Sequence, residues 1–151
     1  MSIKQPDPLV PADTDICGMD GFLLRADKLL GSELWALSTG DEFKAALGLW
    51  CRAWGQTPPG SLPDDDKILA AFSGAGARWP KVRDMALRGF VKCADGRLYH
   101  KTLSEDVVRA AVAKKQRNDR TVNATNARKK QRDVDRDVRR NVIRLEQREG
   151  N

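Results

Sequence analysis

The dipeptide Asp95-Gly96 lies between two short runs of residues with high β-propensity, 90–93 and 97–100. Asp-Gly is one of the strongest short-range signals for a two-residue turn, because glycine readily adopts the positive φ that such a turn needs. The sequence therefore predicts a β-hairpin at this point. Gly89, directly before the hairpin, is expected to end a helix over residues 77–88.

A longer helix is predicted earlier in the chain, where Thr39 and Glu42 have the spacing of a capping box. Apolar residues then recur at steps of three and four, which predicts one buried helix face. The members of this face are Phe43, Ala46, Leu47, Trp50 and Trp54. The Gly- and Pro-rich stretch 55–60 is expected to end the helix.

Three consecutive aspartates, Asp64 to Asp66, precede a short helical pattern whose expected inner face is Ile68, Leu69 and Phe72. Acidic residues at a helix start complement the positive end of the helix dipole. A metal site is the alternative, but successive side chains on a helix point about 100° apart and do not converge on one ion. Capping is therefore the favoured interpretation.

The predicted order is helix, helix, tight turn, helix, hairpin, helix. This order indicates a mainly α protein with a small β-hairpin, arranged as a winged helix-turn-helix. The helix that directly follows the turn, over residues 77–88, has an expected inner face of Trp79, Val82, Met85 and Ala86. Residues 78–101 contain seven Lys or Arg and two Asp, a balance of +5 that suits contact with DNA. A protein-interaction module with ordinary exposed charges is the alternative.

Charge is distributed unevenly along the chain. Residues 1–113 hold 14 Lys or Arg and 15 Asp or Glu, whereas residues 114–151 hold 13 and 6. A segment with such a basic excess commonly binds an anionic polymer. We therefore divide the chain into a flexible arm (1–20), a winged-helix domain (21–113) and a basic, partly helical tail (114–151).

The tail is expected to extend a helix that begins at residues 104–106 and has Val107, Val108, Ala111 and Val112 facing inward. A polar break is expected at residues 121–126, followed by a second basic helix. That helix carries a thin apolar seam of Val134, Val138, Val142 and Leu145. The seam is too short for a stable isolated coiled coil. It suits a partner helix or folding on DNA, and a fraying charged helix is the alternative.

No catalytic or metal-binding constellation is evident. The three cysteines are far apart and form no CxxC pair, and His100 is the only histidine. Neither an apolar leader nor a membrane-spanning run of about 18 residues is present. We expect a cytoplasmic protein with reduced thiols, no cofactor and no enzymatic activity.

The stretches SLPDDDKILAAFSG and WPKVRDMALRGFVKCADGRLYHK, with FKAALGLWCRAWGQTPPGSLPDDD upstream, resemble a prophage-encoded domain family often called YdaU-like. The resemblance covers roughly residues 19–113. It implies a winged-helix fold similar to the N-terminal domains of phage replication-initiation or replisome-organiser proteins. No catalytic residues are established for that family, so none is implied here.

These observations favour a phage-derived protein that binds double-stranded DNA in replication initiation or gene regulation. The expected DNA-contacting cations are Arg78, Lys81, Arg88, Lys92, Arg97, Lys101, Lys114, Lys115, Arg117, Arg128, Lys129 and Lys130. The first three are expected in the groove, the next three at the backbone from the wing, and the rest as a non-specific grip. An adaptor that docks a replication or transcription protein, with the C-terminal seam as its docking helix, is the alternative. The oligomeric state is left open.

Overall fold

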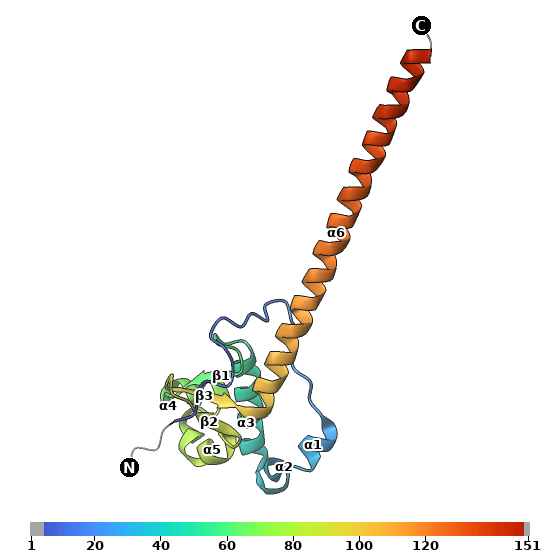
Figure 1. Cartoon of the computed structure of the whole chain (residues 1–151). Helices are drawn as coiled ribbons and strands as arrows, with labels where there is room; N and C mark the ends of the chain where they lie inside the picture. The colour runs from blue at the N-terminus through green and yellow to red at the C-terminus, as the bar shows by residue number, and fades with distance from the viewer. Residues whose placement is uncertain (1–4, 150–151) are drawn as a thin grey trace. The chain divides into compact units, whose positions relative to one another are not determined.

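The computed structural model describes residues 5–149. Its internal contacts define two compact units, residues 1–112 and 113–151. The elements of the first unit are Ala26–Leu30 (α1), Glu33–Leu37 (α2), Gly40–Trp54 (α3), Ser61–Pro63 (β1), Asp66–Ser73 (α4), the 3-10 turn Gly76–Arg78 (η1), Trp79–Ala86 (α5), Phe90–Lys92 (β2) and Arg97–His100 (β3) (Figure 1). Helix α6, Lys101–Glu149, begins in the first unit and forms the second.

The fold is mainly helical with a small antiparallel sheet, as the sequence predicts, but the sheet has three strands rather than two. Its order is β1-β3-β2. The predicted hairpin is confirmed, with Gly96 at φ +78° in the turn. Strand β1 pairs with the other edge of β3, so that Leu62 lies opposite Leu98. The three residues of β1 include a proline and give no strand signal in the sequence. They form a strand because they pair with β3 in the tertiary structure.

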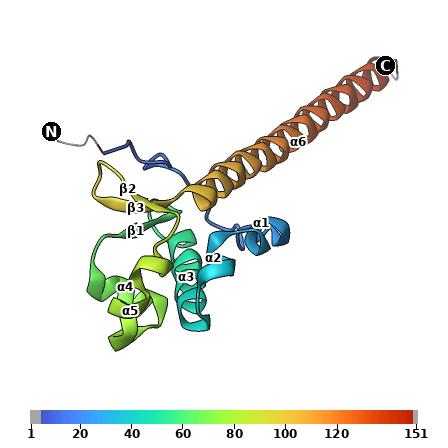
Figure 2. The same ribbon diagram turned by 90° about the horizontal axis from the view of Figure 1, so that it is seen from below.

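Helix α3 starts with the predicted capping box. Thr39 Oγ1 accepts a hydrogen bond from Glu42 N, and Glu42 Oε2 accepts one from Thr39 N at 2.7 Å. The most buried face differs from the expected one, because it consists of Ala45, Ala46, Leu49 and Ala53. The predicted Trp50 and Trp54 are only half-buried. Small residues form the innermost face because α4 and α5 both pack closely on it (Figure 2).

Helix α5 is shorter than the predicted helix over residues 77–88. Residues 76–78 form a 3-10 turn, and Leu87 and Arg88 lie in the turn after the last helical residue, Ala86. Pro80 lies in the first turn of α5, where its missing N–H costs nothing and marks the start of the helix. Its inner face is the predicted one, with Trp79, Val82 and Ala86 buried.

The buried face at the start of α6 also differs from the prediction. The helix begins at Lys101, and its buried apolar residues are Leu103, Val107 and Ala110. Val108 and Val112, which were expected inside, are 43% and 51% exposed. Asp106 is buried on the same face, and its carboxylate bonds to Arg25 at 3.1 Å, which favours this rotation of the helix.

The predicted break at residues 121–126 is wrong, because α6 continues through it. The hydroxyl of Thr121 donates to the carbonyl oxygen of Arg117 at 3.0 Å, and that of Thr125 donates to the carbonyl oxygen of Thr121 at 2.9 Å. Each threonine thus satisfies its hydroxyl within the helix rather than capping a new one. The Asn and Thr content of this stretch lowers helix propensity without interrupting the helix.

The N-terminal arm forms no helix or strand between residues 5 and 20, which agrees with an extended segment. It nevertheless packs on the domain. Val10 and Ile16 are buried in a cluster with Tyr99 and Val107. The amide of Ala94, at the hairpin, also donates to the carbonyl oxygen of Pro6 at 2.9 Å. Residues 1–4 of the predicted arm and 150–151 of the predicted tail lie outside the described residues.

Replacing Leu49 with alanine should destabilise the protein by about 2–5 kcal/mol, because its side chain is fully buried on the inner face of α3. Thermal or urea unfolding followed by circular dichroism measures this change. Leu37→Ala is the matched control, since Leu37 is 62% exposed, and it should change stability by less than about 0.5 kcal/mol. Equal effects of the two variants would contradict this packing.

Candidate nucleic-acid interface

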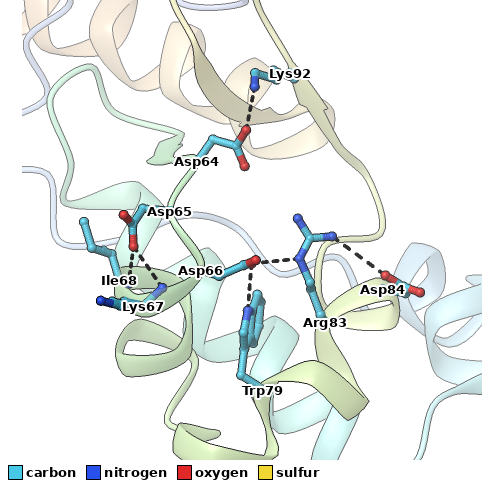
Figure 3. Close-up of polar contacts among 9 residues, drawn as sticks. All are labelled: Asp64, Asp65, Asp66, Lys67, Ile68, Trp79, Arg83, Asp84 and Lys92. Atoms are coloured by element: carbon cyan, nitrogen blue, oxygen red, sulfur yellow. Dashed lines mark hydrogen bonds and ion pairs between the residues drawn. The ribbon is translucent and has the colours of Figure 1, made fainter.

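The three consecutive aspartates between β1 and α4 have three different partners (Figure 3). Asp65 is the N-cap of α4, and its Oδ1 accepts hydrogen bonds from the backbone N–H groups of Lys67 at 2.9 Å and Ile68 at 3.1 Å. The predicted capping role is confirmed for this residue. It satisfies two amide groups that a helix start otherwise leaves without partners.

Asp66 joins α4 to α5. One oxygen, Oδ1, accepts from Trp79 Nε1 at 2.9 Å and from Arg83 Nε at 2.8 Å (Figure 3). The pKa of Asp66 is lowered from its ordinary value, first by the hydrogen bond from Arg83 and then by the one from Trp79. The indole N–H of a buried tryptophan thereby obtains the partner that it needs.

Asp64 pairs with the hairpin, since its Oδ2 lies 2.7 Å from Lys92 Nζ (Figure 3). The three carboxylates therefore connect to α4 itself, to α5 and to β2. No group of three or more His, Cys, Asp or Glu side chains in the described residues is arranged to hold a metal ion. The three acids therefore organise the region formed by α4, α5 and the hairpin.

Arg83 is the residue in this region that sequence reasoning missed. It was counted in the local charge but given no role, and it forms the Asp66 contact and a longer ion pair with Asp84 at 3.8 Å. Its position four residues after Trp79 was the available signal. Residues at this spacing share one face of a helix, so both side chains reach the same carboxylate.

Two of the predicted groove-facing cations are paired with acids of earlier helices. Arg78 Nη1 lies 2.7 Å from Asp41 Oδ2, and both side chains are 57% exposed. Arg88 pairs with Glu33, and it lies in the turn after α5 rather than on the helix. The expectation that Arg88 projects from the helix is therefore wrong, because the helix ends at Ala86.

Arg97 points across the sheet. Its Nε donates to Ser61 Oγ on β1 at 2.8 Å, and its Nη2 donates to Gln56 Oε1 at 3.4 Å. The side chain is half-buried. Lys92, a predicted wing cation, is held by Asp64. Lys101 was predicted in the wing, but it is the first residue of α6, and it has no ion-pair partner among residues 5–149.

Six of the seven remaining predicted cations are exposed and carry no ion pair within residues 5–149. Lys81 is the member on α5. The members on the long helix are Lys115, Arg117, Arg128, Lys129 and Lys130. Lys114 is the exception, since it is half-buried and has an interaction of its own. Most of the unneutralised positive charge therefore lies on α6.

The hairpin that would serve as a wing is braced by Asp95. Its Oδ1 accepts from the backbone N–H of Arg97 at 3.0 Å, and its Oδ2 accepts from the hydroxyl of Tyr99 at 2.7 Å. Burial raises the pKa of Tyr99 well above its ordinary value, and the carboxylate of Asp95 raises it further. Tyr99 thus remains a neutral donor that fixes the turn.

His100 is a packed side chain. Its ring lies 5.1 Å from the ring of Trp50 and 5.0 Å from that of Phe90, measured between centroids. Its Nδ1 accepts from the backbone N–H of Leu103 at 3.3 Å, at the start of α6. Burial lowers the pKa of His100 to about 4. The ring is therefore neutral at pH 7 and supplies no positive charge to the surface.

Residues 32–108 match the model of a family described as Protein of unknown function (DUF1376). The chain belongs to this family. The DUF1376 match runs from the N-cap of α2 into the first turns of α6, so it includes the acidic triplet, the sheet and His100. Comparison with curated proteins and with solved structures found no match. No helix within residues 5–149 combines the length and apolar content needed to cross a bilayer.

The stability of this DUF1376 domain should fall as the pH decreases from about 6.5 to about 4. In this window the unfolded chain binds a proton at His100 and the folded one does not, so protonation favours unfolding. The loss should be on the order of 2–3 kcal/mol, measured as the free energy of urea unfolding across the pH range.

His100→Gln is the control, because glutamine retains an acceptor for Leu103 N–H but does not titrate. Its stability should change little over the same window. The ionisation of Asp66, whose pKa is lowered, should affect both proteins only at lower pH. Equal pH dependence of the two proteins between pH 6.5 and 4 would contradict a buried neutral His100.

Proposed function

We propose that this DUF1376 protein binds double-stranded DNA and that the exposed basic surface of α6 supplies most of the affinity. The observation that carries the proposal is the imbalance of charge on this helix. Residues 114–151 hold 13 Lys or Arg against 6 acids, and residues 115–149 are all exposed. Each cation that neutralises a phosphate releases a condensed counterion, which favours binding at moderate salt.

The proposal assigns the first unit to the winged-helix class. Two features support it: the element order α3, β1, α4, α5, β2, β3 and the sheet order β1-β3-β2. In this class the second helix of the helix-turn-helix enters the major groove and the hairpin contacts the adjacent backbone. Here α5 would be the groove helix and Lys81 its unneutralised cation.

The ion pairs of the first unit are compatible with a second, weaker set of contacts. Exposed pairs such as Arg78–Asp41 contribute about 0–1 kcal/mol, so the cation exchanges its carboxylate for a phosphate at small cost. Arg88 and Lys92 are in the same situation. Arg97 is not available to bind a phosphate in this way, because its half-buried guanidinium donates hydrogen bonds to Ser61 and Gln56 within the domain.

The biological setting that we propose is replication initiation or gene regulation in a phage or prophage. This part rests on the resemblance of residues 19–113 to the YdaU-like prophage-encoded domains. Binding that relies on a basic helix suits either role, since both require a protein to find and remain on DNA.

A second candidate function is an adaptor that docks a replication or transcription protein. It is supported by a cluster of exposed apolar side chains in the α1–α2 region: Leu23, Leu24, Leu30, Trp35 and Leu37, each 48–67% exposed. A cavity of ≈ 300 Å³ lies beside α1, lined by residues that include Phe22, Leu29 and Trp50. Exposed apolar groups of this kind commonly mark protein contacts. Affinity through such a surface would depend only weakly on salt.

Replacing Lys115, Arg117 and Lys129 with glutamine should weaken DNA binding and flatten its salt dependence. If all three engage phosphates, the slope of log K against log salt concentration should fall in magnitude by up to about 2.7. Fluorescence anisotropy with one labelled duplex, at several salt concentrations, measures both quantities.

The control replaces three exposed lysines of the first unit, Lys28, Lys44 and Lys67, with glutamine. It therefore changes the net charge by the same amount as the α6 variant. Its slope should match that of the parent protein. A parent protein that does not bind, or a slope unaffected by the α6 substitutions, would reject the proposed role of α6. Salt-insensitive binding to a protein partner would then favour the adaptor function.

A further inference from the structure

One stripe along α6 carries no charge although the helix around it is highly charged. Between residues 124 and 145, 11 of 22 residues are Asp, Lys or Arg. Positions that alternate at steps of three and four line one side of a helix and form the a and d positions of a coiled coil. In this helix they are Ala124, Ala127, Gln131, Val134, Val138, Asn141 and Leu145. At a frequency of one half, three or four of these seven positions would be charged, and none is.

The apolar residues of this stripe are exposed. Val134, Val138 and Leu145 have exposed fractions of 48%, 55% and 58%, respectively. A single helix in water gains little from such side chains, because most helical stability in proteins comes from packing an apolar face. A second helix placed on the stripe would remove these groups from water.

We propose that a second copy of this chain covers the stripe, forming a parallel two-stranded coiled coil over residues 124–145. This segment spans three heptads and is longer than the apolar seam of residues 134–145 alone. In a parallel pair, each g residue faces the e residue five positions later on the other helix. Lys130 then faces Asp135 of the second copy. The two residues have opposite charge, and the pair occurs twice in a symmetric dimer.

The contacts within the helix leave Asp135 available for this pairing. Asp133 and Asp137 each lie near an arginine three residues later, at 4.0 and 3.7 Å. Asp135 instead accepts a hydrogen bond from the amide of Gln131 at 2.9 Å and has no cationic partner among the described residues. A lysine from a second helix would supply the missing charge.

The antiparallel register that buries Val134, Val138 and Leu145 together places like charges together. In this register Val134 packs against Val138 and Ala127 against Leu145, while g residues face g residues and e residues face e residues. Asp137 would then face Asp137, Asp135 would face Asp135, and Lys130 would face Arg144. The polar a residue Gln131 also meets its own copy only in the parallel, in-register pair, as register-setting polar residues do.

The same positions define where the coiled coil begins. Continuing the heptads toward the N-terminus brings Arg120 and Arg117 onto the d and a positions. In a parallel dimer each would face its own copy with like charge. The paired segment therefore starts at Ala124, after these two arginines.

Sedimentation equilibrium of the full chain tests this proposal. Because no DNA is present in the experiment, its outcome is independent of the DNA-binding proposal. The protein should show a concentration-dependent dimer. Val138→Asp should raise the dimer dissociation constant at least about tenfold, because it buries a charge in the seam. Ile143→Asp is the matched control: Ile143 is 53% exposed but lies off the stripe, so its effect should stay within about twofold.

The charge swap tests orientation and register. Lys130→Asp and Asp135→Lys should each weaken the dimer, and the double variant K130D/D135K should restore it, since opposite charges face each other again. A chain that stays monomeric at every concentration, equal effects of Val138→Asp and Ile143→Asp, or a double variant no better than the single ones would overturn the proposal. A helix that binds a different protein but not itself would overturn it as well.

Discussion

The close approach of α3 to the end of α4 is the contact on which the rest of the domain depends. A Cβ at Gly48 would lie 3.2 Å from the carbonyl oxygen of Ser73 and 3.3 Å from that of Phe72. Only a glycine lets the two backbones pack at this distance without a shift. The neighbouring alanines of α3 extend the same shallow surface, against which α4 and α5 both pack. The turn between α4 and α5, and hence the placement of the acidic triplet, follows from this packing.

Acidic side chains neutralise four of the cations of the first unit. Asp41, Asp64, Asp66 and Glu33 each hold one cation of the segment between Arg78 and Lys101. The local balance of +5 in the sequence therefore overstates the positive charge that this surface presents, because the acids come from outside the segment. Helix α6 has the opposite character, with exposed cations in excess of acids. We propose that α6 supplies most of the affinity for DNA. In this proposal the first unit contributes the shape of a groove helix and a hairpin.

Local signals in the sequence predicted the capping box at Thr39, a capping role for the acidic triplet 64–66 and the hairpin at Gly96, because each depends on residues close together in the chain. Strand β1 was missed because its pairing with β3 is a long-range contact with no local signature. The ion pairs of Arg78 and Arg88 were missed for the same reason. The inner face of α3 was placed on its aromatic residues, because size suggests burial, whereas close helix packing selects small residues. The DNA-contacting role of the cations remains a prediction.

The central claim is that unneutralised cations on α6, rather than those paired within the first unit, contact DNA. Lysine acylation footprinting of the full chain, with and without a duplex at moderate salt, tests it most directly by mass spectrometry. The account predicts strong protection of Lys115 and Lys129 and little change at Lys44 and Lys67, which are exposed but are not among the proposed contacts. Protection confined to Lys81 and Lys92, with Lys115 and Lys129 as reactive as in the free protein, would contradict it.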